Sequence, residues 1–155
     1  MCQVMVLPNG MGEMKTILNG NKAKMVSMAG AKVLTEIEVN DMKVDALLFL
    51  EMNYKDANLK IELTGAKDIE GAKTHEVTVT YPSGKKGKRY YDVKTGLLLS
   101  KVDEKGSAVY SDYQAFDGIM FFTKGKVESP QGQVGLTVEK VEVNVNLADA
   151  DFAVE

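Results

Sequence analysis

The sequence predicts a mostly β protein with a minor α component: a curved antiparallel sheet, or half-barrel meander, with one or two short helices across its concave face. Three observations predict this fold class. Turn sequences recur about every 10–14 residues along much of the chain. The segments between them alternate apolar and polar side chains, as expected for a strand with one face exposed to solvent. A single stretch breaks this alternation with helical spacing.

Glycine marks most of the predicted turns. Asn9-Gly10 and Asn19-Gly20 have the sequence of tight hairpin turns, because both residue types tolerate positive φ angles. Five further turn sequences follow: Pro82-Ser83-Gly84, Lys94-Thr95-Gly96, Glu104-Lys105-Gly106, Asp117-Gly118 and Pro130-Gln131-Gly132. Short strands joined in succession by such turns form a meander.

The alternation assigns side chains to the two faces of the sheet. Residues 76–81 place valine and tyrosine on one face and glutamate and threonine on the other. In the last predicted strand the apolar residues stand at even numbers over 134–138 and at odd numbers over 141–147. We therefore expect a β-bulge at Glu139-Lys140, where the phase changes.

The helical stretch covers residues 36–50. Thr35 and Glu38 have the spacing of a capping box, which marks the start of a helix. Apolar residues then recur at roughly helical intervals from Ile37 to Leu47. We expect either one helix over this stretch or two short ones.

Length and charge limit the classes of protein to which this chain could belong. A chain of 155 residues is long enough for one domain, and we expect a single domain over residues 1–155. The net charge of −3 disfavours nucleic acid as a partner, and the apolar run 46–50 is too short to span a membrane.

The N-terminal residues 1–7 alternate like a strand and lack a basic leader. This beginning is what we expect of a fragment of a longer protein.

The sequence offers no combination of residues suited to catalysis or metal binding. His75 is the only histidine and Cys2 the only cysteine, and they are far apart in sequence. A catalytic triad or a zinc motif needs partners that neither residue has nearby in sequence. We therefore predict no enzymatic activity, no metal and no cofactor. The basic run Gly84–Arg89 is interpreted as a solvated hairpin tip, with contact to anionic lipid as the alternative.

Methionine is unusually frequent, with nine in the chain. Its flexible thioether suits adaptable apolar surfaces as well as loosely filled cores. The methionines that could line a cavity are Met14, Met25, Met28, Met42, Met52 and Met120. Ordinary core packing is the alternative interpretation.

Four segments carry a resemblance to a known family. They are Asp68–Val77, Arg89–Leu97, Tyr110–Phe121 and Val141–Phe152. From about Lys60 to the end, this succession resembles the C-terminal half of the LolA/LolB-like lipoprotein carriers. It is most similar to non-catalytic domains appended to insulinase-type zinc peptidases of Bacteroidetes-like bacteria.

The resemblance implies a periplasmic or cell-envelope protein whose curved sheet encloses an apolar space. In the carrier family such a space accommodates acyl chains, so a lipid or lipoprotein is the implied partner. The residues expected to line it are Met42, Leu47, Leu48, Phe49 and Phe122. The carriers also have a longer N-terminal part than this chain. Edge strands left exposed could therefore pair between two copies to give a homodimer.

Two functions remain open on this basis. The first is a module that binds an apolar ligand such as a lipid or a lipoprotein acyl chain. The second is a structural or interaction domain that supports a zinc-peptidase module in the same chain, with no ligand of its own. An independent hydrolase is disfavoured, because the sequence lacks a nucleophile and base pair.

Overall fold

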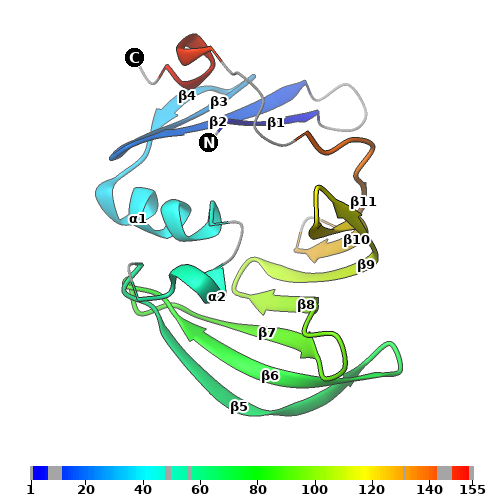
Figure 1. The fold of residues 1–155 in the computed structure, drawn as a ribbon. Coiled ribbons are helices and arrows are strands. Elements are labelled where there is room, and N and C mark those ends of the chain that lie inside the picture. Colours follow the sequence, from blue (N-terminus) through cyan, green and yellow to red (C-terminus); the bar gives the residue numbers. More distant parts are fainter. Residues whose placement is uncertain are drawn as a thin grey trace. The chain divides into compact units, whose positions relative to one another are not determined.

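The computed structural model describes residues 2–6, 12–47, 50–55, 57–130, 132–142 and 148–153. The chain divides into two compact units, Met1–Ala57 with Asn146–Glu155, and Asn58–Val145. Each unit contains one antiparallel sheet, of four strands in the first and seven in the second (Figure 1). The predicted mostly β, antiparallel class is therefore confirmed, although its strands form two open sheets rather than one.

The first sheet is a meander of four strands. Its strands are β1 (Cys2–Val6), β2 (Glu13–Asn19), β3 (Lys22–Ser27) and β4 (Gly30–Val33). They pair in chain order, and the turn between β2 and β3 consists of Gly20 and Asn21, one residue later than the predicted Asn19-Gly20. The predicted turn at Asn9-Gly10 lies outside the described residues. Leu18 lies opposite Ala23 and Thr16 opposite Met25, so these four side chains share one face of the sheet.

Two short helices follow β4, as the sequence predicted. They are α1 (Glu36–Asp45) and α2 (Leu50–Asn53). Helix α1 contacts β2 and β3, where Val39 joins Leu18 and Ala23 in a buried cluster. Val39 and Val44 are the buried valines of α1, whereas Ile37 in its first turn is exposed.

A capping box begins α1. The Glu38 backbone N–H donates to Thr35 Oγ1, and the Thr35 backbone N–H donates to Glu38 Oε2 at 2.8 Å. Lys32 on β4 donates to Glu38 Oε1 at 2.6 Å, which links the sheet to the start of the helix. This hydrogen bond from Lys32, followed by those from Thr35, lowers the pKa of Glu38 to about 2.

We expect acid to weaken this junction of sheet and helix. A carboxyl whose pKa is lowered by folding stabilises the fold above its ordinary pKa, and the contribution is lost as pH falls toward the folded value. For Glu38 the loss runs from about 4.5 down to about 2. Glu38→Gln keeps a capping side chain but loses the charge, so the helical circular dichroism signal of this variant should depend less on pH in that window. An unchanged pH dependence would contradict the role assigned to Glu38.

The second sheet has seven strands joined by short turns. They are β5 (Lys60–Ile69), β6 (Ala72–Thr80), β7 (Lys86–Asp92), β8 (Leu98–Asp103), β9 (Gly106–Phe116), β10 (Ile119–Ser129) and β11 (Gly132–Thr137). Each strand pairs with its neighbour in sequence, so the sheet is a meander with β5 and β11 at its edges. The five turns predicted after residue 80 all occur where one strand gives way to the next, with Gly106 and Gly132 as the first residues of β9 and β11, and Gln131 lies outside the described residues.

Two details of the predicted strands are wrong. Strand β11 ends at Thr137 and residues 138–142 are not in a strand, so the phase change at Glu139-Lys140 marks the exit from the sheet rather than a bulge. The predicted basic hairpin tip, Gly84–Arg89, mostly belongs to β7, because pairing with β6 and β8 extends the strand back to Lys86. Register shifts occur instead between Leu63 and Gly65 and between Tyr90 and Tyr91.

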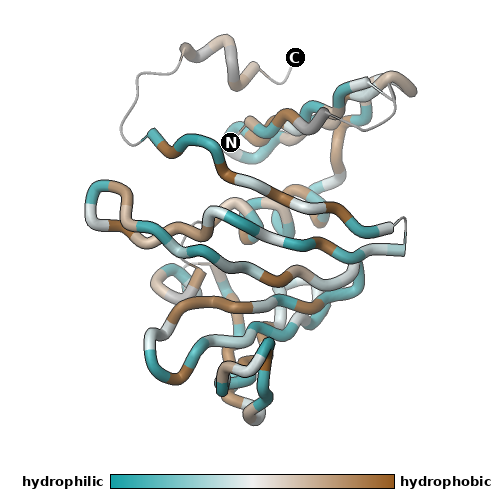
Figure 2. Tube along the Cα trace, turned by 90° about the vertical axis from the view of Figure 1, so that its right-hand side faces the viewer, coloured by the Kyte–Doolittle hydropathy of each residue, from teal (hydrophilic) through white to brown (hydrophobic). Residues whose placement is uncertain are grey.

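The strand register separates the second sheet into two faces, and hydrophilic and hydrophobic residues alternate along several strands in Figure 2. One row of directly opposed residues crosses all seven strands: Leu63, Val77, Arg89, Lys101, Ala108, Val127 and Val134. We name the side that carries this row the apolar face. Arg89 and Lys101 interrupt the apolar row near its centre.

The opposite face carries a polar network around Glu76 on β6. Its carboxylate accepts hydrogen bonds from Lys88 Nζ at 2.8 Å, Tyr90 Oη at 3.1 Å and Thr64 Oγ1 at 3.1 Å. Tyr90 is only 4% exposed, and Lys67 Nζ lies 5.5 Å from its ring centre. The network thus connects three neighbouring strands, β5, β6 and β7.

Candidate functional site

A hollow lies on the helix-bearing face of the first sheet. Met14 and Met25 share this face with Thr16 and Leu18, because side chains two apart on a strand point the same way and Thr16 lies opposite Met25. Helix α1 packs at Leu18 and Ala23, toward the β2–β3 turn. Farther from this turn, the two methionines line a hollow of about 270 Å³. We name it the methionine hollow.

The other residues that line the hollow have small side chains, except for one lysine with a long apolar stem. Ser27, Ala29, Gly30 and Ala31 contribute little side-chain volume, and Lys32 completes the lining. Lys32 is held at the rim, since its ammonium donates to Glu38 at the start of α1. A long lysine stem can cover apolar surface while its charged end stays in water. The hollow therefore presents adaptable thioethers and small side chains with one ion pair at its edge.

The predicted lining residues lie in different places. Met42 on α1 packs against the buried cluster of the first unit, and Leu47 is half-buried just after this helix. Leu48 and Phe49 lie outside the described residues. Phe122 is half-buried in the second unit, on β10, with its ring centre 4.5 Å from that of Tyr110. The lining of one space by these five residues stays a prediction.

Sequence patterns gave only a partial signal for the hollow. Met14 and Met25 were among the methionines considered as cavity-lining residues, but so were Met28 and Met52, which are exposed. What distinguishes the first two is the register of β2 with β3, which places both on the helix-bearing face. No sequence pattern predicted that the small residues after Met25 line this hollow.

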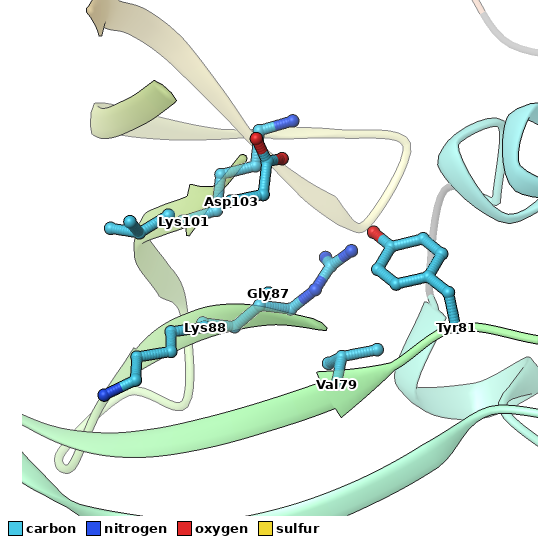
Figure 3. Close-up of a pocket in the computed structure, with 8 residues that line it drawn as sticks. Val79, Tyr81, Gly87, Lys88, Lys101 and Asp103 are labelled. Atoms are coloured by element: carbon cyan, nitrogen blue, oxygen red, sulfur yellow. The ribbon is translucent and has the colours of Figure 1, made fainter. Parts of the chain in front are cut away.

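The second unit has a smaller hollow on its sheet. Figure 3 shows Val79 on β6, Tyr81 just after this strand and Asp103 on β8, with Gly87 on the intervening strand β7. Its space of about 10 Å³ is the size of a single water molecule. An acyl chain does not fit there.

A wider groove of about 290 Å³ runs along β9, β10 and β11. Its lining is mixed, because Lys124, Lys126, Ser111 and Glu70 share it with Val109 and Leu136. Lys124 Nζ also forms an ion pair with Asp112 at 2.7 Å, which raises the pKa of Lys124. This density of charge suits an apolar ligand poorly.

His75 and Cys2, the residues considered for nucleophilic or metal chemistry, belong to different units of the chain. Within the described ranges, no three histidine, cysteine, aspartate or glutamate side chains lie close enough together to hold a metal ion. His75 is exposed on β6, as expected for a sheet-face residue, and Cys2 is a free thiol on β1. No helix among the described residues has the length and apolar character to cross a membrane.

Comparison with known proteins gives a likeness in fold. A DUF1329 family protein from Desulfovibrio piger superposes with a TM-score of 0.59 at 18% identity, over 96% of this chain and 72% of that one. A domain from Vibrio parahaemolyticus, assigned to outer membrane lipoprotein sorting, superposes with a TM-score of 0.58 at 13% identity, over 90% and 68%. No family profile and no curated protein matches the sequence. Neither structure is described as an enzyme, and the chain shares the fold of these two proteins, one of them a lipoprotein-sorting domain.

Proposed function

We propose that this protein is a non-catalytic cell-envelope domain that binds the acyl chain of a lipid or lipoprotein, and that the chain enters the methionine hollow. The observation that carries the proposal is the incomplete cover of one sheet face. Helix α1 covers Leu18 and Ala23, while Met14 and Met25 on the same face line open space. An apolar chain placed there would complete the burial that the helix begins.

The chemistry of the lining supports this ligand class. Methionine side chains adapt their shape and are common on surfaces that accept varied apolar ligands. The small residues beside them leave room, and the volume of about 270 Å³ is slightly below the range of about 300–1,000 Å³ typical of small-molecule sites, so it suits part of an acyl chain. The fold likeness to a lipoprotein-sorting domain agrees with an acyl ligand and with an envelope location.

The predicted lining residues extend this proposal. Met42 and Leu47 belong to α1 and its end, and α1 packs on the same sheet face that carries the hollow. We include these two residues as secondary contributors, and a lining role for Leu48, Phe49 and Phe122 stays a prediction. The alternative, a domain that supports a zinc-peptidase module of the same chain, rests on sequence resemblance alone.

A fluorescent fatty acid tests the proposal directly. The wild-type chain should take it up and shift its emission, whereas Met25→Lys should weaken binding at least about tenfold, because it places an ammonium in the apolar lining. The matched control is Met52→Lys, since Met52 is 81% exposed on α2. Met25→Leu should bind as well as the wild type, because it keeps apolar volume.

Thermal unfolding of each variant separates lost binding from lost folding. Absence of uptake by the folded wild-type protein would sink the proposal. Equal binding by folded Met25→Lys and Met52→Lys would place any lipid site outside the methionine hollow.

A further inference from the structure

The two edges of the second sheet differ in their protection. Edge strands invite pairing with other chains unless charges, bulges or prolines blunt them. Strand β5 is blunted, with Lys60, Glu62, Lys67 and Asp68 along it and a register shift at its middle. Strand β11, Gly132–Thr137, has neither charge nor proline, and its pairing with β10 runs without a shift.

The outer edge of β11 presents backbone pairing positions that no described strand uses. Val138 N–H donates to Thr123 O at 2.8 Å, in the same register that places Thr137 opposite Lys124. Hydrogen-bonded pairs alternate along antiparallel strands, so the even-numbered residues of β11 bond to β10. The odd-numbered residues Gln133, Gly135 and Thr137 therefore direct their N–H and C=O groups outward. Among the described strands, none pairs with this side of β11.

We propose that β11 is a self-association edge, at which a second copy of this chain pairs antiparallel with Gly135 on the twofold axis. In this register Gly135 lies opposite its own copy, and Gln133 lies opposite Thr137. These are the outward-bonding residues, so the three opposed pairs can exchange six backbone hydrogen bonds. The inference does not depend on lipid binding.

The side chains of β11 are complementary to themselves in this register. Val134 of each copy lies opposite Leu136 of the other, on the apolar face, where the two side chains are 54% and 38% exposed in the single chain. Each apolar pair buries surface that is now in contact with water. A register centred on Val134 would instead place Leu136 opposite Gly132, which offers no side chain.

Charges on β10 neither drive nor oppose pairing in this register, because they lie three strand spacings from those of the other copy. Glu128 stands beside Gln133, and Lys124 stands beside Thr137. Since Gln133 of one copy faces Thr137 of the other, each row joins Glu128 of one copy to Lys124 of its partner. The row through Gly135 has Lys126 at both ends, separated by three strand spacings of about 4.8 Å each. At physiological salt, a separation beyond the screening length of about 8 Å leaves little repulsion.

Sedimentation velocity of the full 155-residue chain tests the proposal. The dimer fraction should rise from micromolar to millimolar protein, and Gly135→Asp should weaken self-association at least about tenfold. The two new carboxylates would face each other at the axis, where like charges oppose pairing. Within one chain the new carboxylate would lie opposite Lys126, and a side chain at this position meets nothing within 4 Å, so the variant should fold. Ala66→Asp on the opposite edge, β5, is the matched control and should dimerise like the wild type.

Oxidative cross-linking checks the register. In a Cys2→Ser background, Gly135→Cys should form a disulfide between copies, because opposed residues of a hydrogen-bonded pair have Cα atoms about 5.5 Å apart. Ala66→Cys should remain unlinked. A monomer at every concentration would overturn the proposal. It would also be overturned if Gly135→Asp dimerised like the wild type and Ala66→Cys formed the disulfide between copies.

Discussion

Gly106→Ala is expected to cost more than about 3 kcal/mol of the free energy of unfolding, or to prevent folding altogether. Gly106 begins β9 with a φ of +141°, a conformation that residues with a side chain rarely adopt. A Cβ added there would also overlap the backbone oxygen of Glu128 on β10. This oxygen belongs to a paired strand and cannot move without breaking the ladder between β9 and β10. Urea denaturation followed by circular dichroism measures the loss.

Gly132→Ala is the matched control for this prediction. Gly132 begins β11 with a similar φ of +129°, but a Cβ added there meets nothing within 4 Å. The control therefore shares the backbone strain and lacks the steric overlap, so its loss should be about 1–2 kcal/mol. Equal losses for the two variants would show that the close approach of β9 and β10 at Gly106 has no energetic consequence.

The second large effect is expected at Glu76. Glu76→Ala should cost about 2 kcal/mol, because it removes the acceptor of three hydrogen bonds and leaves the buried Tyr90 hydroxyl without this partner. Glu76→Gln retains an acceptor and should lose less. Glu62→Ala is the control on the neighbouring strand: its carboxylate pairs with Lys60 in an exposed ion pair, and such pairs contribute little.

The same network should respond to pH. The hydrogen bond from Lys88 is the main cause that lowers the pKa of Glu76, while burial opposes it. A lowered pKa in the folded state means that the carboxylate stabilises the fold above its ordinary pKa of 4.5 and that this stabilisation is lost as pH falls below it. The urea midpoint of the wild type should therefore decrease below this pH more than that of Glu76→Gln. Parallel midpoints for the two proteins would contradict the network.

Local features of this fold could be predicted because they depend on neighbouring residues. The hairpin turn between β2 and β3 is local, since Gly20 adopts its positive φ without steric strain. The capping box of Thr35 and Glu38 is equally local, with both partners within one helical turn. The end of β11 at Thr137 was not predicted. Apolar residues move from even to odd positions both where a strand bulges and where it ends, so the sequence pattern alone does not distinguish the two.

The candidate site depended on contacts that sequence spacing does not encode. Met14 and Met25 are eleven positions apart, and only the register of β2 with β3 places them on one face. Met42 has the same residue type but packs into the cluster under α1. Composition alone could not separate a methionine that fills a core from one that lines open space, because both positions favour the same flexible side chain.

The sequence by itself determined the hairpins, the alternation of faces and the helix cap. Tertiary structure decided that the strands form two sheets, that α1 packs on the first of them at Leu18 and Ala23, and that β11 ends the second as an uncharged edge. The reason is physical. Turns and caps are set by backbone preferences of adjacent residues, whereas the cover of a sheet face depends on which segments pack together to bury apolar surface.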